Sequence, residues 1–126
     1  MDRRRFLCTV APFAIGAPLA CTTAVQSPRL QEFELSAIAG QTLTDTGKPP
    51  VPAWTYSGSV PGPQLRVRQG DRVRVHVTNR LAVPTTVHWH GVRLPNAMDG
   101  VPHLTQASIE PGQRFVYEFD ALDAGT

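Results

Sequence analysis

The stretch from Leu65 to Val77, LRVRQGDRVRVHV, alternates apolar and polar residues on both sides of a short turn sequence. Successive side chains of a β-strand point to opposite faces. The alternation therefore predicts two strand segments, joined across Gln69-Gly70-Asp71, with one apolar and one charged face. His76 falls among arginines on the charged face, and we expect it to be a solvated strand residue rather than a metal ligand.

The same two-residue period recurs elsewhere in the chain. It appears in residues 32–37 and 114–119, and a further strand is expected at residues 54–56, after a loop rich in turn formers over residues 44–52. No convincing helical period is present. Short strands separated by Pro/Gly turns predict an antiparallel β-sandwich.

The first 21 residues have the composition of an export signal. Clustered arginines at positions 3 to 5 precede Phe-Leu and a moderately apolar run to Leu19. The run is shorter than the ~20 residues that span a bilayer, and the arginines resemble a twin-arginine signal. Pro-Leu-Ala-Cys ends the leader, so Cys21 is a candidate lipid anchor, with ordinary cleavage near Ala20 or Ala24 as the alternative. We expect an exported protein, periplasmic or in the cell envelope.

Beyond the leader, we expect a linker over residues 22–30 and one domain over residues 31–126. Without the leader, the chain has nine basic and nine acidic residues, so its composition gives no reason to expect nucleic-acid binding. Both cysteines, Cys8 and Cys21, lie in or at the edge of the leader. A blue-copper site needs a cysteine thiolate beside two histidines, so none is expected in the domain.

His88-Trp89-His90-Gly91 is a candidate metal-binding stretch, because two imidazoles one residue apart on a strand share a face. Their Cα atoms would lie roughly 6.5 Å apart, so both rings could hold one ion, or each could hold one of two neighbouring ions. Copper, zinc, iron and nickel all suit imidazole. Two solvated histidines without a ligand are the alternative. Gly91 would allow a close approach by another backbone or a cofactor, or form a plain bend.

Several motifs occur in an order that resembles the first cupredoxin domain of a multicopper oxidase. They are Trp54-Thr55-Tyr56-Ser57-Gly58, Pro61-Gly62-Pro63, Gly70-Asp71, Thr78-Asn79, His88-Trp89-His90-Gly91, Met98-Asp99-Gly100-Val101-Pro102, Thr105-Gln106, Pro111-Gly112 and Ala124-Gly125-Thr126. The resemblance runs from about Gln31 to the last residue. It implies an all-β, Greek-key, cupredoxin-like sandwich. A Trp-x-His-x-His motif normally follows Ala124-Gly125-Thr126 in this family, so we expect a domain that is incomplete at its carboxyl end.

The resemblance also implies roles for individual residues. In laccase-like members, the first histidine of this motif binds type 2 copper and the second binds type 3 copper, which assigns His88 and His90 respectively. Asp99 would relay protons to reduced oxygen; ordinary Asp-Gly turn chemistry is the alternative. Trp89 would keep the two imidazoles oriented from the opposite face. For Met98 and His103 we expect packing or surface roles.

The implied function is that of a laccase-like oxidase, in which dioxygen is reduced with electrons from a small reducing substrate. The type 1 copper site usually belongs to a later domain, so the chain alone is expected to be inactive without the remaining cupredoxin domains. A non-catalytic periplasmic copper-binding or copper-tolerance protein is one alternative. A copper-free structural relative is another, against which retention of both histidines argues.

Overall fold

The computed structural model describes residues 27–42 and 48–125. The predicted leader and most of the predicted linker lie outside these residues. The described elements, in chain order, are β1 (Leu30–Thr42), β2 (Val51–Tyr56), β3 (Arg72–Asn79), the short 3-10 helix η1 (Asn96–Met98) and β4 (Arg114–Asp120). No helix within these two ranges has the length and apolar character needed to cross a membrane. Because the described elements are four strands and one three-residue 3-10 helix, the all-β prediction is confirmed.

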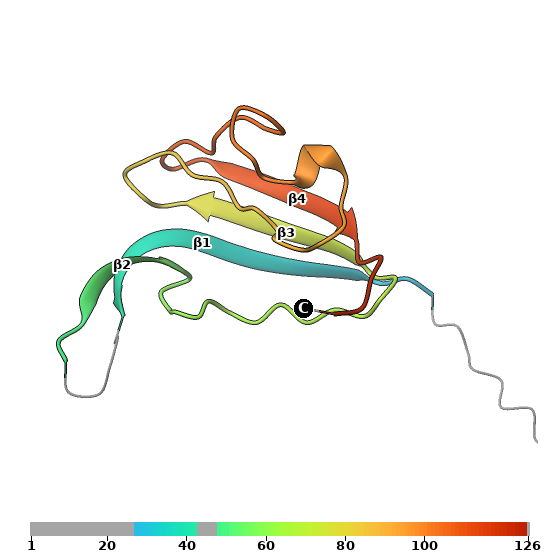
Figure 1. The fold of residues 1–126 in the computed structure, drawn as a ribbon, viewed down its shortest axis with the longest axis horizontal. Coiled ribbons are helices and arrows are strands. Elements are labelled where there is room, and N and C mark those ends of the chain that lie inside the picture. The colour runs from blue at the N-terminus through green and yellow to red at the C-terminus, as the bar shows by residue number, and fades with distance from the viewer. Residues whose placement is uncertain (1–26, 43–47, 126) are drawn as a thin grey trace, which may run out of the picture.

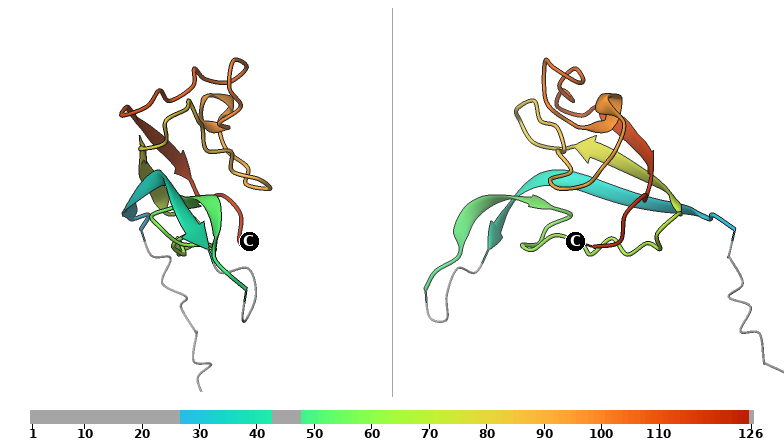
Figure 2. Two further views of the ribbon diagram at one scale, coloured as in Figure 1. Left: turned by 90° about the vertical axis from the view of Figure 1, so that its left-hand side faces the viewer. Right: turned by 45° about the vertical axis from the view of Figure 1, so that its right-hand side comes forward.

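The four strands form one sheet in the order β2-β1-β3-β4 (Figures 1 and 2). Two pairs, β1–β2 and β3–β4, are antiparallel, whereas β1 and β3 run parallel. The sheet is therefore mixed: β1–β2 and β3–β4 have the predicted antiparallel pairing, and the central pair β1–β3 is parallel. Parallel neighbours need a long crossover, and residues 57–71 provide it by returning the chain to the far side of β1.

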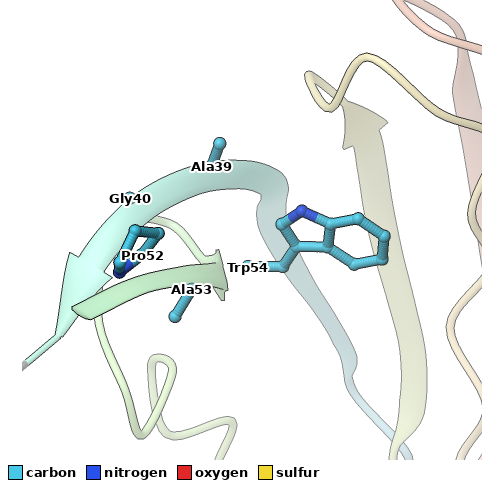
Figure 3. Close-up of a pocket in the computed structure, with 5 residues that line it drawn as sticks. All are labelled: Ala39, Gly40, Pro52, Ala53 and Trp54. Carbon is cyan, nitrogen blue, oxygen red and sulfur yellow. The ribbon is translucent and has the colours of Figure 1, made fainter. Parts of the chain in front are cut away.

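The hairpin of β1 and β2 extends beyond the rest of the sheet, because β3 pairs with Leu30–Ala37 and β2 with Ala37–Thr42. Trp54 of β2 is 68% exposed. It lines a cavity of about 400 Å³ on this hairpin together with its neighbours Ala39, Gly40, Pro52 and Ala53 (Figure 3). β2 begins at Val51, inside the loop expected over residues 44–52, and the predicted strand at residues 54–56 is confirmed.

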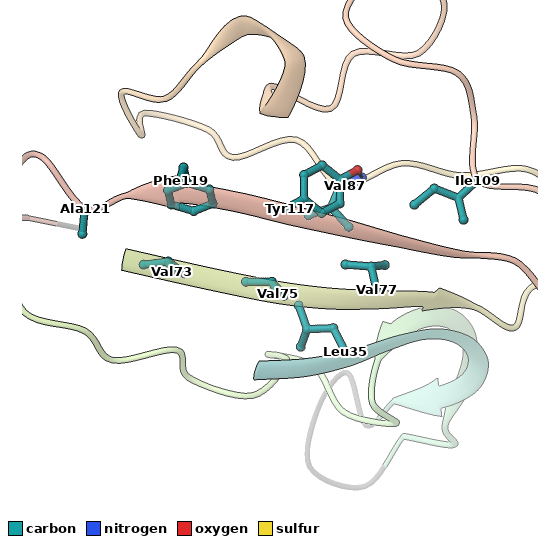
Figure 4. Packing of buried hydrophobic residues seen from close by; sticks show 9 residues of the cluster. All are labelled: Leu35, Val73, Val75, Val77, Val87, Ile109, Tyr117, Phe119 and Ala121. Carbon is teal, nitrogen blue, oxygen red and sulfur yellow. Dashed lines mark hydrogen bonds between the residues drawn. The ribbon is translucent and has the colours of Figure 1, made fainter. Parts of the chain in front are cut away.

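The apolar side chains of β1, β3 and β4 lie on one face of the sheet and form the core. The buried cluster consists of Leu35, Val73, Val75, Val77, Val87, Ile109, Tyr117, Phe119 and Ala121 (Figure 4). On the opposite face, Arg74 bridges Glu32 and Glu118 at 2.9 and 2.7 Å. His76 lies on this charged face as predicted, with Nε2 3.5 Å from Glu32, but its side chain is only 22% exposed and is therefore half-buried rather than fully solvated.

The segment containing Leu65 and Val67 is not a strand, so this prediction is wrong. Both side chains still pack against the core, as their alternation indicated. A strand, however, also needs a neighbouring backbone to pair with, and no described strand lies beside this segment in the sheet order. Alternation identifies the buried face of a segment but gives no information about its neighbours.

The segment between β3 and β4 covers the apolar face (Figure 2). Its Val87 and Ile109 belong to the core cluster (Figure 4). Asn79, fully buried at the end of β3, holds this segment in place. Its Nδ2 donates to the carbonyl oxygens of Val83 and Ile109, both at 2.8 Å, and its Oδ1 accepts the N–H of Leu81 at 2.9 Å. This covering segment carries the candidate metal-binding residues.

Candidate metal centre

Residues 87–89 lie outside the regular strands, and His90 begins a turn with Gly91. Val87 is buried, and Trp89 is half-buried against the core, whereas His88 and His90 are both exposed. The predicted alternation is therefore confirmed, although the pairing of a regular strand is absent. The covering segment gives the two histidines an open, solvent-facing position.

The rings of His88 and His90 lie close together on the exposed side. Their centroids are 6.0 Å apart and their planes differ by 29°. This arrangement is compatible with one shared ion or with two neighbouring ions, so both options from the sequence remain. Within residues 27–42 and 48–125, no group of three or more His, Cys, Asp or Glu side chains could hold a metal. This part of the chain therefore offers a pair of donors.

The backbone of Asp99 fixes the protonation pattern of His88. Nδ1 of His88 lies 2.7 Å from the carbonyl oxygen of Asp99. Since a carbonyl oxygen can only accept, Nδ1 must carry the proton and Nε2 is left with its lone pair. A second hydrogen bond of this kind is typical of histidines that bind metals, because it sets both tautomer and ring orientation. Nε2 of His88 is therefore the ring nitrogen that remains available to accept a bond.

The carboxylate of Asp99 also lies beside His88, with Oδ1 3.4 Å from Nδ1. About one third of the Asp99 side chain is exposed, so this carboxylate is accessible from solvent. The backbone N–H of Asp99 donates to the carbonyl oxygen of Asn96 at 3.1 Å, and Asp99 is the C-cap residue of η1. The structure thus brings Asp99 and His88 together, as a proton-relay role would require.

Gly100 allows the Asp99 turn to approach the histidine segment. Its φ is +78°, and a Cβ built on it would lie 1.8 Å from the carbonyl oxygen of Val87 and 3.0 Å from Cα of His88. No side chain fits in this contact, and a non-glycine residue would also be strained at this φ. The Asp-Gly pair predicted the positive φ. The close approach to Val87 was missed, since nothing in the sequence signals that contact.

Tyr117 and Phe119 hold the segment from the core side. The hydroxyl oxygen of Tyr117 accepts the N–H of Val87 at 2.9 Å. Trp89 packs edge-to-face against Tyr117 and Phe119, with ring centroids 5.6 and 5.2 Å away. Burial raises the pKa of Tyr117, so its hydroxyl stays neutral at physiological pH. The expected structural role of Trp89 agrees with this packing. For Tyr117, the alternation predicted only a place on an apolar face.

The remaining candidates do not join the histidine pair. Gly91 has a φ of +76° in a turn closed by the N–H of Val92 and the carbonyl oxygen of Trp89, and a Cβ built on it would meet nothing within 4 Å. Met98 packs against the core, where its sulfur accepts the N–H of Glu118 at 3.3 Å. His103 is exposed in a turn with a φ of 65°.

A second cavity, of about 470 Å³, lies on the core side of the histidine segment. Trp89, Val92 and Phe119 are among its lining residues, and His88 and His90 are not. The Nε1 of Trp89 is buried and has no hydrogen-bond partner among the described residues. Neither this cavity nor the one on the hairpin is lined by the two histidines, whose side chains are exposed to solvent.

Comparison with known proteins identifies the family. Residues 37–126 match the family model described as multicopper oxidase. The chain is 41% identical over 125 residues to multicopper oxidase MmcO of Mycobacterium tuberculosis, covering 94% of this chain and 24% of that protein. It is 46% identical over 95 residues to copper resistance protein A of Pseudomonas syringae pv. tomato, covering 75% of this chain and 15% of that protein.

Solved structures give the same result. A multi-copper oxidase from Pseudomonas thermotolerans superimposes with a TM-score of 0.73 at 46% identity, over 79% of this chain and 24% of that one. A blue copper oxidase from Nitrosomonas europaea does so with a TM-score of 0.71 at 41% identity, over 77% of this chain and 30% of that one. The chain spans about a quarter or less of the curated relatives described above. By sequence and by fold, it belongs to the multicopper oxidase family and has its cupredoxin-like architecture.

Proposed function

We propose that this chain is the amino-terminal cupredoxin-like domain of an exported, laccase-like multicopper oxidase, and that His88 binds its type 2 copper and His90 one of its type 3 coppers. The observation that carries the proposal is the exposed histidine pair, in which the Asp99 carbonyl oxygen leaves Nε2 of His88 free. Imidazole nitrogen is a preferred donor for copper. The residues present therefore fit the metal that the family implies.

Each residue of the site would have a distinct task in the parent protein. Bound copper would supply the redox chemistry by which dioxygen is reduced with electrons from a small reducing substrate. His88 and His90 would provide nitrogen donors, and the Asp99 carbonyl oxygen would hold His88 in the correct tautomer. The Asp99 carboxylate, close to His88 and partly exposed, would move protons between solvent and the site.

The test uses the full-length protein that carries this sequence. His88→Ala and His90→Ala should each lower the copper content, measured by atomic absorption. His88→Ala should also remove the electron paramagnetic resonance (EPR) signal of the type 2 Cu(II). His103→Ala is the matched control, because His103 is exposed but lies outside the pair. Wild-type copper content and an unchanged EPR spectrum in both variants of the pair would contradict the proposal.

A second candidate is a copper-binding protein that confers copper tolerance without turnover. The similarity to copper resistance protein A of Pseudomonas syringae pv. tomato, and at 40% identity to that of Escherichia coli, favours a role in copper resistance. Oxygen uptake separates the two candidates. Copper-dependent uptake that is lost in His88→Ala supports the oxidase, whereas copper binding without any uptake supports the second candidate.

A further inference from the structure

We infer that Tyr117 is a positioning residue for residues 86–91, the segment that carries His88 and His90. Its hydroxyl supplies a backbone hydrogen bond that a neighbouring strand would otherwise provide. The inference rests on the proposed copper role of His88 and His90. Tyr117 is fully buried midway along β4, where it pairs with Val75 of β3. Its hydroxyl oxygen accepts the N–H of Val87, the residue before His88. The orientation of the segment is thereby tied to the middle of β4 and to the buried core.

Few other hydrogen bonds hold the backbone of this segment. Among the described residues, Val87 has the only backbone N–H between residues 86 and 91 that finds a partner. A paired strand would have its backbone fixed at every second residue. Here one hydroxyl has that task, and Val87 is 6% exposed, so water would not readily replace the lost partner.

Tyr117 contacts the segment on both sides of His88. Its hydroxyl meets Val87, and its ring meets the edge of Trp89. On the other side, Gly100 abuts the carbonyl oxygen of Val87. Val87 is therefore held at its N–H by the core and at its carbonyl by the Asp99 turn. A change at the Tyr117 hydroxyl should redirect His88 and, through Trp89, His90.

Tyr117→Phe in the full-length protein isolates this bond, because phenylalanine keeps the ring and removes only the hydroxyl. Copper affinity, measured by competition with a chelator, should fall about 10–100-fold, as for other groups that orient metal ligands. The EPR spectrum of bound Cu(II) should shift as well. Val75→Ala is the control, since it weakens the same core without removing a bond to the segment, and it should leave the spectrum unchanged.

A second measurement does not depend on how well the variant folds. In the wild-type protein, the Val87 amide should exchange its hydrogen much more slowly than the amides of His88, Trp89 and His90. Equal exchange rates for the four amides would overturn the inference. So would wild-type copper affinity and spectrum in Tyr117→Phe while His88→Ala loses copper, a result that leaves the proposed function intact. If His88→Ala and His90→Ala both keep their copper, the proposed function fails, and the role of Tyr117 fails with it.

Discussion

Gly100→Ala should damage the copper site more than any other single-methyl addition to a positive-φ glycine of the described chain. The new Cβ would lie 1.8 Å from the Val87 carbonyl oxygen, whereas real Cβ contacts stay above about 3.0 Å. The Asp99 turn and the histidine segment must therefore separate by more than an ångström. That displacement is enough to break the 2.7 Å hydrogen bond from Nδ1 of His88 to Asp99.

The expected cost follows from these contacts. A non-glycine residue in a left-handed conformation costs about 1–2 kcal/mol, and the lost hydrogen bond costs about 1 kcal/mol. With the overlap added, unfolding of this domain should become easier by about 3 kcal/mol. Copper affinity should fall about 10–100-fold, because His88 loses the group that orients it.

Gly112→Ala is the matched control. Gly112 has a φ of +79°, nearly that of Gly100, but a Cβ there meets nothing within 4 Å. Its substitution should therefore carry the conformational cost alone and leave copper affinity unchanged. Urea unfolding and chelator competition on both variants of the full-length protein provide the comparison. If Gly100→Ala is no less stable than Gly112→Ala and binds copper equally well, the steric reasoning is refuted.

Three further predictions concern the neighbouring residues. Asp99→Asn keeps the backbone acceptor but removes the carboxylate, so oxygen uptake should fall about 100-fold or more at unchanged copper content; an unchanged rate would leave Asp99 as a turn residue only. Asn79→Leu removes three buried hydrogen bonds and should lower the free energy of unfolding by about 3 kcal/mol, with Thr78→Ala on the opposite face as a milder control. The backbone N–H groups of Arg68 and Arg29 hold the pKa of Asp71 below its usual value. Asp71 therefore stabilises the fold above about pH 4, and this contribution is lost on further acidification; urea midpoints should fall more steeply there in the wild type than in Asp71→Asn.

Alternation predicted which side chains are buried but not how the strands are paired. Val73, Val75 and Val77 lie on the core face as expected. The same alternation would arise beside a parallel or an antiparallel neighbour, so the parallel pairing of β1 with β3 could not be predicted from it. For the same reason, a strand was predicted around Leu65 where the described chain provides no partner strand.

The placement of the histidine pair on one side of its segment was predictable because it is local. A strand places residues i and i+2 on one side. His88 and His90 are both exposed beside buried Val87 and half-buried Trp89, even though the segment is not a paired strand. The groups that orient them were not predictable. The Asp99 carbonyl oxygen and the Tyr117 hydroxyl reach the segment across 11 and 30 residues of sequence, and these distances depend on the path of the loops and on the sheet register.

A copper-edge anomalous difference map of the copper-loaded, full-length protein tests the metal site most directly. Density for copper should appear next to Nε2 of His88, with Nδ1 still bound to the carbonyl oxygen of Asp99, and a copper ion should also lie beside His90. Copper bound elsewhere, with both imidazoles free in solvent, or bound to His88 through Nδ1, would contradict the proposed centre.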